Sequence, residues 1–226
     1  MTLAGSTGPV GSGSMARRTS SAFQPMGDTV PKPLQLQDQQ DFLTLIRRNP
    51  INSLIIERLP ELGTPDTQLV AGSLVQTVWN CLSGKRPEED ILDYDVFYYD
   101  PSDLGWDAED AAIRRARAAF ADLGIEVQVR NQARVHLWYQ QKFGIQCPPL
   151  EGVHDGIDHF LNQSSCFGVS QHNGETKVYA PFGFADLFSM TVRPNCRRNL
   201  PEIYYRKAQR WREAWPRLRV MEWPDR

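Results

Sequence analysis

Residues 91–100 read ILDYDVFYYD, an apolar and aromatic run that carries two acids, Asp93 and Asp95, two positions apart. The aromatic and β-branched residues predict a β-strand that ends at Pro101. Alternate residues of a strand point to the same face, so the two carboxylates lie side by side. Like charges this close repel each other and resist burial without a partner. The strand therefore predicts a binding partner for the pair.

A divalent cation is the partner that these acids favour. Mg²⁺ prefers carboxylate oxygens and keeps water and phosphate oxygens as its other ligands. The next predicted strand, IEVQVRN at residues 125–131, adds Glu126 on a face that a crossover helix would bring beside the pair. Three carboxylates on neighbouring strands can hold one or two Mg²⁺ ions that activate an attacking oxygen and stabilise a leaving phosphate. The alternative is that the aspartates serve a turn or a cap and that Glu126 faces solvent.

A second candidate element lies upstream, where Gly72 and Ser73 sit in a stretch that we expect to be helical from about Thr67 to Leu82. Glycine at a helix start lets backbone N–H groups approach a phosphate, and a serine hydroxyl can donate to it. The alternative for this pair is a close contact between the helix and a neighbouring element.

Polar residues also follow the strand at residues 125–131. Arg130 and Arg134 could pair with triphosphate oxygens, and Asn131 could orient an acceptor hydroxyl or a sugar. A buried polar network that fixes the strand–helix junction explains the same residues equally well.

The rest of the chain predicts an α/β or α+β domain with a small mixed sheet flanked by helices. Helical periodicity precedes the acidic strand, and the turn HNGE at residues 172–175 predicts a hairpin. A final helix begins at Pro201 and carries tryptophans on one face. Residues 1–35 are rich in Gly, Ser, Thr and Pro and predict a disordered tail, so residues 36–226 form the domain.

Charge and composition narrow the classes of protein. The segment 193–226 carries ten basic and four acidic residues, a net +6, whereas the remaining residues carry 15 and 23, a net −8. The basic segment could attract a polyanion or could be a solvated amphipathic helix. No apolar run is long enough to span a bilayer, and four scattered cysteines suggest a reduced, cytoplasmic protein. The Ser- and Arg-bearing, acid-poor start also leaves a mitochondrial transit peptide open.

The order of these elements resembles the DNA polymerase beta-like nucleotidyltransferase superfamily. An apolar residue with Gly72-Ser73, a helix, Asp93-x-Asp95 opening a strand, and Glu126 on the next strand follow its pattern. The chain is more closely similar to uncharacterised nucleotidyltransferase-like proteins of bacteria and fungi. The stretches that carry this similarity are DYDVFYYD, VRNQARVHLWYQQKFG, DGIDHF, VYAPFGFADLF and RPN with the final helix, over residues 36–223.

This resemblance implies the small mixed sheet of the polymerase-beta type and an Mg²⁺ (or Mn²⁺) and NTP site. Asp93, Asp95 and Glu126 would hold the metal, Gly72 and Ser73 would grip the phosphates, and an NMP would pass from an NTP to an acceptor hydroxyl. The acceptor stays open among a small molecule, a protein and an RNA end. The alternatives are an inactive module that binds a nucleotide or a partner, and a metal-dependent nuclease.

Overall fold

The computed structural model describes residues 32–224 of the 226-residue chain. The predicted tail at residues 1–35 falls almost wholly outside the described residues. Eight α-helices are present in residues 32–224: α1 (Lys32–Ile46), α2 (Pro50–Arg58), α3 (Gly72–Leu82), α4 (Trp106–Ala119), α5 (Val135–Phe143), α6 (Val153–Asp158), α7 (Ala185–Phe188) and α8 (Pro201–Ala214). None of them combines the length and the apolar character needed to cross a membrane.

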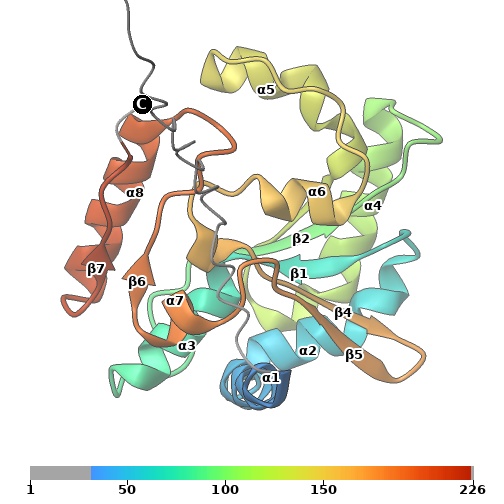
Figure 1. The fold of residues 1–226 in the computed structure, drawn as a ribbon. Helices are drawn as coiled ribbons and strands as arrows, with labels where there is room; N and C mark the ends of the chain where they lie inside the picture. The colour runs from blue at the N-terminus through green and yellow to red at the C-terminus, as the bar shows by residue number, and fades with distance from the viewer. Residues whose placement is uncertain (1–31, 225–226) are drawn as a thin grey trace, which may run out of the picture. The chain divides into compact units, whose positions relative to one another are not determined.

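The strands form one larger and one smaller sheet in the described part of the chain (Figure 1). They are β1 (Gln68–Val70), β2 (Tyr94–Tyr98), β3 (Val127–Asn131), β4 (Gly168–His172), β5 (Glu175–Tyr179), β6 (Thr191–Val192) and β7 (Arg219–Val220). The larger sheet has the order β3-β2-β1-β4-β5, and β6 pairs with β7 in the smaller one. The predicted mixed sheet flanked by helices is confirmed.

The central strands of the larger sheet run in mixed directions. β2 and β3 are parallel, and α4 lies between them in the chain as the predicted crossover helix. β1 is antiparallel to both β2 and β4. β4 and β5 form an antiparallel hairpin whose turn is Asn173-Gly174, both at positive φ, as the sequence predicts.

The stretch that the sequence predicts as one helix from about Thr67 splits into two elements. Residues Gln68–Val70 form β1, all three of them buried, and the helix α3 begins only at Gly72. Three residues are too few to show a strand period, and both neighbouring strands come from distant sequence. The helical prediction for residues 67–71 is therefore wrong, while the helix after Gly72 is confirmed.

The two faces of the larger sheet have different surroundings. Tyr94, Val96 and Val129 are buried in the main core, together with apolar residues of α1, α3 and α4. The opposite face carries Asp95 and Phe97, with α6 packed over part of it. Figure 1 shows α6 on the side of the sheet opposite α1 and α2. The core residues of β2 thus decide which face its acids occupy.

Glycines let α6 approach the sheet closely. A Cβ atom at Gly168 would lie 2.3 Å from Oε1 of Gln68 and 2.6 Å from Cδ1 of Ile157 on α6. A Cβ atom at Gly156 on α6 itself would lie 2.4 Å from Oε1 of Gln132. Because these distances are shorter than van der Waals contact, a side chain at either glycine would displace the side chain of Gln68, Ile157 or Gln132.

A tryptophan cluster fixes the C-terminal helix α8 to α3. Trp79 of α3 makes edge contacts with Trp211 and Trp215, at ring-centroid distances of 5.2 and 5.6 Å. The indole Nε1 of Trp215 also donates to Oδ1 of Asn80 at 2.9 Å. The orientation of α8 is therefore set by buried aromatic contacts, which matters for the basic residues that it carries.

Candidate active site

Asp93 and Asp95 lie at the start of β2. Asp93 immediately precedes the strand and Asp95 is its second residue. Their neighbours Tyr94 and Val96 are buried in the core, so the acids face the opposite side of the sheet. This confirms the shared face that the strand pattern predicts.

The electrostatics of Asp95 show that the two acids act on each other. Burial, and then the charge of Asp93, raise the pKa of Asp95 to about 6. Two cations, Lys207 and Arg130, oppose this rise. Burial lowers the pKa of the Lys207 ammonium, and Asp95 and Asp93 both counteract that decrease. Two carboxylates and two basic side chains thus share one half-buried region, which would accommodate a cation and a phosphate together.

The start of α3 lies beside this pair. Val70 of β1 is directly opposite Asp95 of β2, and the chain then turns at Ala71 and enters α3 at Gly72. Ala71 adopts a φ of +52°, a conformation that an L residue rarely takes. The first turn of α3 therefore presents free backbone N–H groups near the acids, as an anion site requires.

Ser73 is enclosed by its surroundings in the first turn of α3. Its side chain is fully buried, and its Oγ atom has no hydrogen-bond partner among the described residues. Gly72 has more room, since a Cβ there would meet only the amide of Gln76, at 3.2 Å. The predicted position of both residues beside the acids is present in the structure, and their contact with phosphate stays a prediction.

Glu126 is not gathered with the aspartates. It precedes β3, its side chain is exposed, and its carbonyl accepts a hydrogen bond from the Tyr94 amide at 3.3 Å. The β3 residue opposite Asp95 is Gln128. No group of three or more His, Cys, Asp or Glu side chains within residues 32–224 is arranged to hold a metal ion. The structure therefore supplies a pair of carboxylates, and the role of Glu126 as a third stays a prediction.

Arg130 and its two predicted companions separate in space. Arg130 is opposite Phe97 on the acidic face, whereas Asn131 is opposite Tyr98 on the core face. Asn131 is buried, accepts from the amides of Asp100 and Ala133 through Oδ1, and donates to the Asp100 carbonyl at 2.8 Å. Of the three, only Arg130 lies on the face that carries Asp95.

Arg134 is engaged in an ion pair with Glu109 of α4, which is itself 3% exposed. Its Nε atom donates to the Leu104 carbonyl at 3.0 Å, and Oε1 of Glu109 accepts from the Asn131 amide at 2.9 Å. These contacts form the buried network at the strand–helix junction that the sequence left open as an alternative.

Lys207 was not singled out from the sequence, although a signal was present. It lies three residues after Tyr204 and four before Trp211, and therefore on the buried face of α8. Its Nζ atom stands 4.7 Å from the centre of the Trp211 ring. A lysine on the apolar stripe of a helix is thus a usable sign of a partly buried charge.

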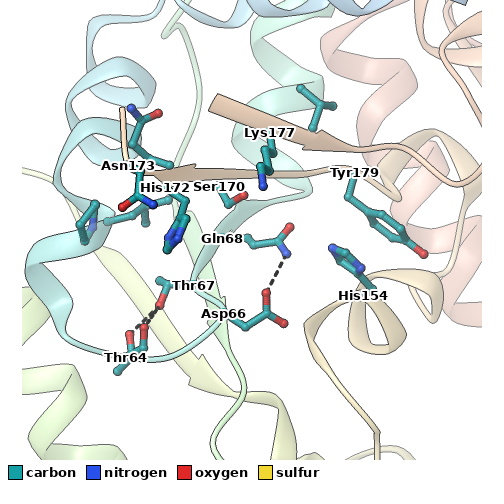
Figure 2. Close-up of a pocket in the computed structure, with 14 residues that line it drawn as sticks. Thr64, Asp66, Thr67, Gln68, His154, Ser170, His172, Asn173, Lys177 and Tyr179 are labelled. Carbon is teal, nitrogen blue, oxygen red and sulfur yellow. Dashed lines mark hydrogen bonds between the residues drawn. The ribbon is translucent and has the colours of Figure 1, made fainter. Parts of the chain in front are cut away.

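A larger recess, of about 780 Å³, lies farther along the same face of the sheet (Figure 2). Gln68 and Lys177 point into it from the strands, and His154 of α6 stacks on Tyr179 at 3.7 Å. β1 carries Gln68 at the end away from Asp95. The recess is therefore separate from the acidic pair.

The comparisons with known proteins identify the family and the fold. The profile described as Nucleotidyltransferase matches residues 57–220, which include every candidate site residue named so far. The chain belongs to this nucleotidyltransferase family. The resemblance predicted from the sequence is thereby confirmed, and the family supports nucleotide transfer as the kind of function.

One solved structure resembles this chain over most of its length. It is an NMR structure that is described as revealing a CCA-adding enzyme head domain, with a TM-score of 0.67 and 22% sequence identity. The match covers 81% of this chain and 96% of that one. At this identity the similarity establishes the fold. No curated protein sequence matches the chain.

Proposed function

We propose that the protein is an Mg²⁺-dependent nucleotidyltransferase that moves an NMP from an NTP to an acceptor hydroxyl. The observation that carries this proposal is the position of Asp93 and Asp95 beside the first turn of α3, inside a chain of the nucleotidyltransferase family. The acids suit a cation and the helix start suits phosphates.

The carboxylate pair fits a divalent metal by its chemistry. Asp95 is half-buried next to a like charge, which raises its pKa, and a bound dication would relieve that repulsion. Asp93 and Asp95 would hold Mg²⁺ or Mn²⁺, with phosphate and water oxygens as the remaining ligands. Bound there, the ion would neutralise phosphate charge and make the acceptor hydroxyl a better nucleophile.

Different residues of the chain would then have separate roles in the transfer. The N–H groups at the start of α3 would hold the outer phosphates, and Gly72 leaves space for them. The acceptor oxygen forms a bond to the α-phosphorus while the bond to the β-phosphate oxygen breaks and pyrophosphate leaves. The hydroxyl proton passes to a base or to solvent water, and the sequence predicts Glu126 as that base although its side chain is exposed in the structure. Arg130 and Lys207 would stabilise the added negative charge.

The test replaces Asp95 with Asn and measures transfer of the labelled NMP from each of the four α-labelled NTPs, with Mg²⁺ and with pools of small molecules, proteins and RNA as acceptors. We expect transfer by the wild-type protein and a decrease of about 100-fold or more in Asp95→Asn. Asp90→Asn is the matched control, since Asp90 is exposed and adopts a φ of +59°, which Asn tolerates. Full activity of Asp95→Asn would refute the assignment.

A second candidate function is a binding module of the same fold. Two observations favour it: Gln128 occupies the position opposite Asp95, and Glu126 is exposed. Calorimetry with a non-hydrolysable NTP separates the two functions. Binding that needs no Mg²⁺, together with no pyrophosphate release from hydrolysable NTPs, would favour the module.

A further inference from the structure

A cavity of about 230 Å³ adjoins the acidic pair on the β3 side of the sheet. Its wall combines aromatic side chains of α5, of β2 and of the segment after α6 with basic residues from three separate segments. The aromatic residues lining it are Phe97, Trp138, Tyr139, Phe143 and Phe160. The basic residues are Arg130 of β3, Arg198 of the loop before α8, and Lys207 of α8, and no Asp or Glu lines the cavity.

Arg198 is the most informative of these residues. It is 8% exposed, and its Nε atom has no hydrogen-bond partner among the described residues. Its contacts are the sulfur of Cys147, at 3.1 Å from Nη2, and the ring of Tyr139, whose centre lies 4.0 Å from the guanidinium carbon. A buried guanidinium costs free energy unless an anion balances it. Within residues 32–224, no carboxylate forms an ion pair with Arg198, Arg130 or Lys207.

The cavity and the start of α3 flank the carboxylates from opposite sides. In the sheet, β2 with Asp95 lies between β1, which leads into α3, and β3, which carries Arg130. Arg130 and Lys207 line the cavity and also act on the charge of Asp95. A ligand in the cavity would thus reach the acids from the side that the helix start leaves free.

We propose that this cavity binds the acceptor, and that the acceptor is a small molecule that carries an oxyanion, phosphate or carboxylate, on a flat ring. The identification of the ligand as the acceptor rests on the proposed function, whereas the binding of such a ligand does not. The basic side chains would pair with the oxyanion, and the aromatic walls would stack on the ring. The modest volume suits a compact molecule better than a polymer end.

The test measures binding of phenyl phosphate and benzoate by calorimetry, without NTP or metal, and follows the Trp138 indole signal by NMR. We expect binding of at least one of the two probes, a shift of that signal, and a loss of about tenfold or more in affinity in both Arg198→Gln and Lys207→Gln. The probe that binds more tightly shows whether the cavity prefers a phosphate or a carboxylate. Lys207 is only half-buried, so its variant tests the proposal even where Arg198→Gln unfolds.

Matched controls make the result specific to the cavity. Arg206→Gln removes one positive charge from the exposed side of α8 and is expected to leave binding unchanged. Equal affinity for the neutral benzyl alcohol, or unchanged affinity in both cavity variants, would overturn the proposal. A single-stranded RNA that binds through Arg198 and Lys207 where both small probes fail would also overturn it.

The two proposals fail separately. Probe binding needs no catalysis, so it is observable in a protein that transfers no nucleotide. Asp95→Asn removes a proposed metal ligand but no residue that lines the cavity, and it is expected not to weaken probe binding.

Discussion

Asp95 occupies a position where its charge is unfavourable for the metal-free fold. The side chain is half-buried in a sheet face, beside a second acid, and its pKa rises from 3.8 to about 6. Because the folded chain binds this proton more tightly than the unfolded chain, the stability that the group contributes is present below about pH 4. It is lost as the pH rises through about 6.

The direction of this pKa shift predicts that Asp95→Asn stabilises the metal-free protein at neutral pH. In the presence of EDTA, we expect the free energy of unfolding to increase by about 2 kcal/mol at pH 7.5 and to change far less at pH 4. Urea denaturation at the two pH values measures the difference, with Asp90→Asn as the control. A variant that is less stable than the wild type at pH 7.5 would contradict this account.

Ala71 is a second residue of the site whose local conformation is energetically unfavourable. Its positive φ belongs to a region where a side chain is unfavourable, yet its methyl group is buried against Val153 and Ile157 of α6. Its amide donates to the Phe167 carbonyl at 3.0 Å, which helps to hold the turn in place. The turn that starts α3 is thus fixed by packing and by one backbone hydrogen bond.

At the scale of elements, the sequence predicted those with a clear period and missed those that depend on distant partners. The strand at Asp95, the crossover helix, the hairpin at residues 168–179 and α8 all carry local signals. β1 does not, because three buried residues form a strand only between β2 and β4. The β6–β7 pair was missed for the same reason, since each strand has two residues.

The residues of the candidate site also fall into those that a local pattern predicts and those that depend on distant contacts. Asp93, Asp95 and the Gly72 turn come from neighbouring sequence, so a local pattern was enough to bring them together. The contributions of Lys207 and Arg198 depend on how α8 and its preceding loop fold back, which no spacing encodes. Arg134 could not be separated from Arg130 by sequence, because only the folded position of α4 brings Glu109 into an ion pair with Arg134.

The Glu109–Arg134 ion pair provides a prediction for the β3–α4 junction. Arg134→Gln leaves the buried carboxylate of Glu109 without its cation, and we expect a loss of about 3 kcal/mol in the free energy of unfolding. Arg114→Gln, which breaks an exposed ion pair with Asp110 on the same helix, should cost about 0.5 kcal/mol or less. Chemical denaturation of both variants measures the contrast. A similar small loss in both would argue that Arg134 is free for a ligand.

For the whole molecule, the basic C-terminal segment is more than a solvated helix. Its net charge of +6 contrasts with −8 for the rest of the chain. In the structure, α8 packs its tryptophans on α3 and directs Lys207 toward the acidic pair. The segment therefore contributes both to the hydrophobic core and to the charge around the acidic pair.

This packing predicts that Trp215 contributes strongly to the stability of the fold. Trp215→Ala removes a buried ring and the donor to Asn80, and we expect a loss of about 4 kcal/mol in the free energy of unfolding. Trp106→Ala is the control, since that ring is 59% exposed and should cost about 1 kcal/mol or less. Urea titrations of the two variants measure both values. Equal losses would mean that the α3–α8 contact is weak.

The elements on the two sides of the acidic pair come from sequence stretches of very different length. The turn at Gly72 and the aspartates lie within 24 successive positions, whereas the wall of the smaller cavity is assembled from residues between Phe97 and Lys207. Substitutions in α5, α6 or the loop before α8 can accordingly reshape that wall and leave the β1–α3–β2 unit untouched. On the proposed function, such a layout would let related proteins diverge in what they modify while the transfer chemistry is inherited unchanged.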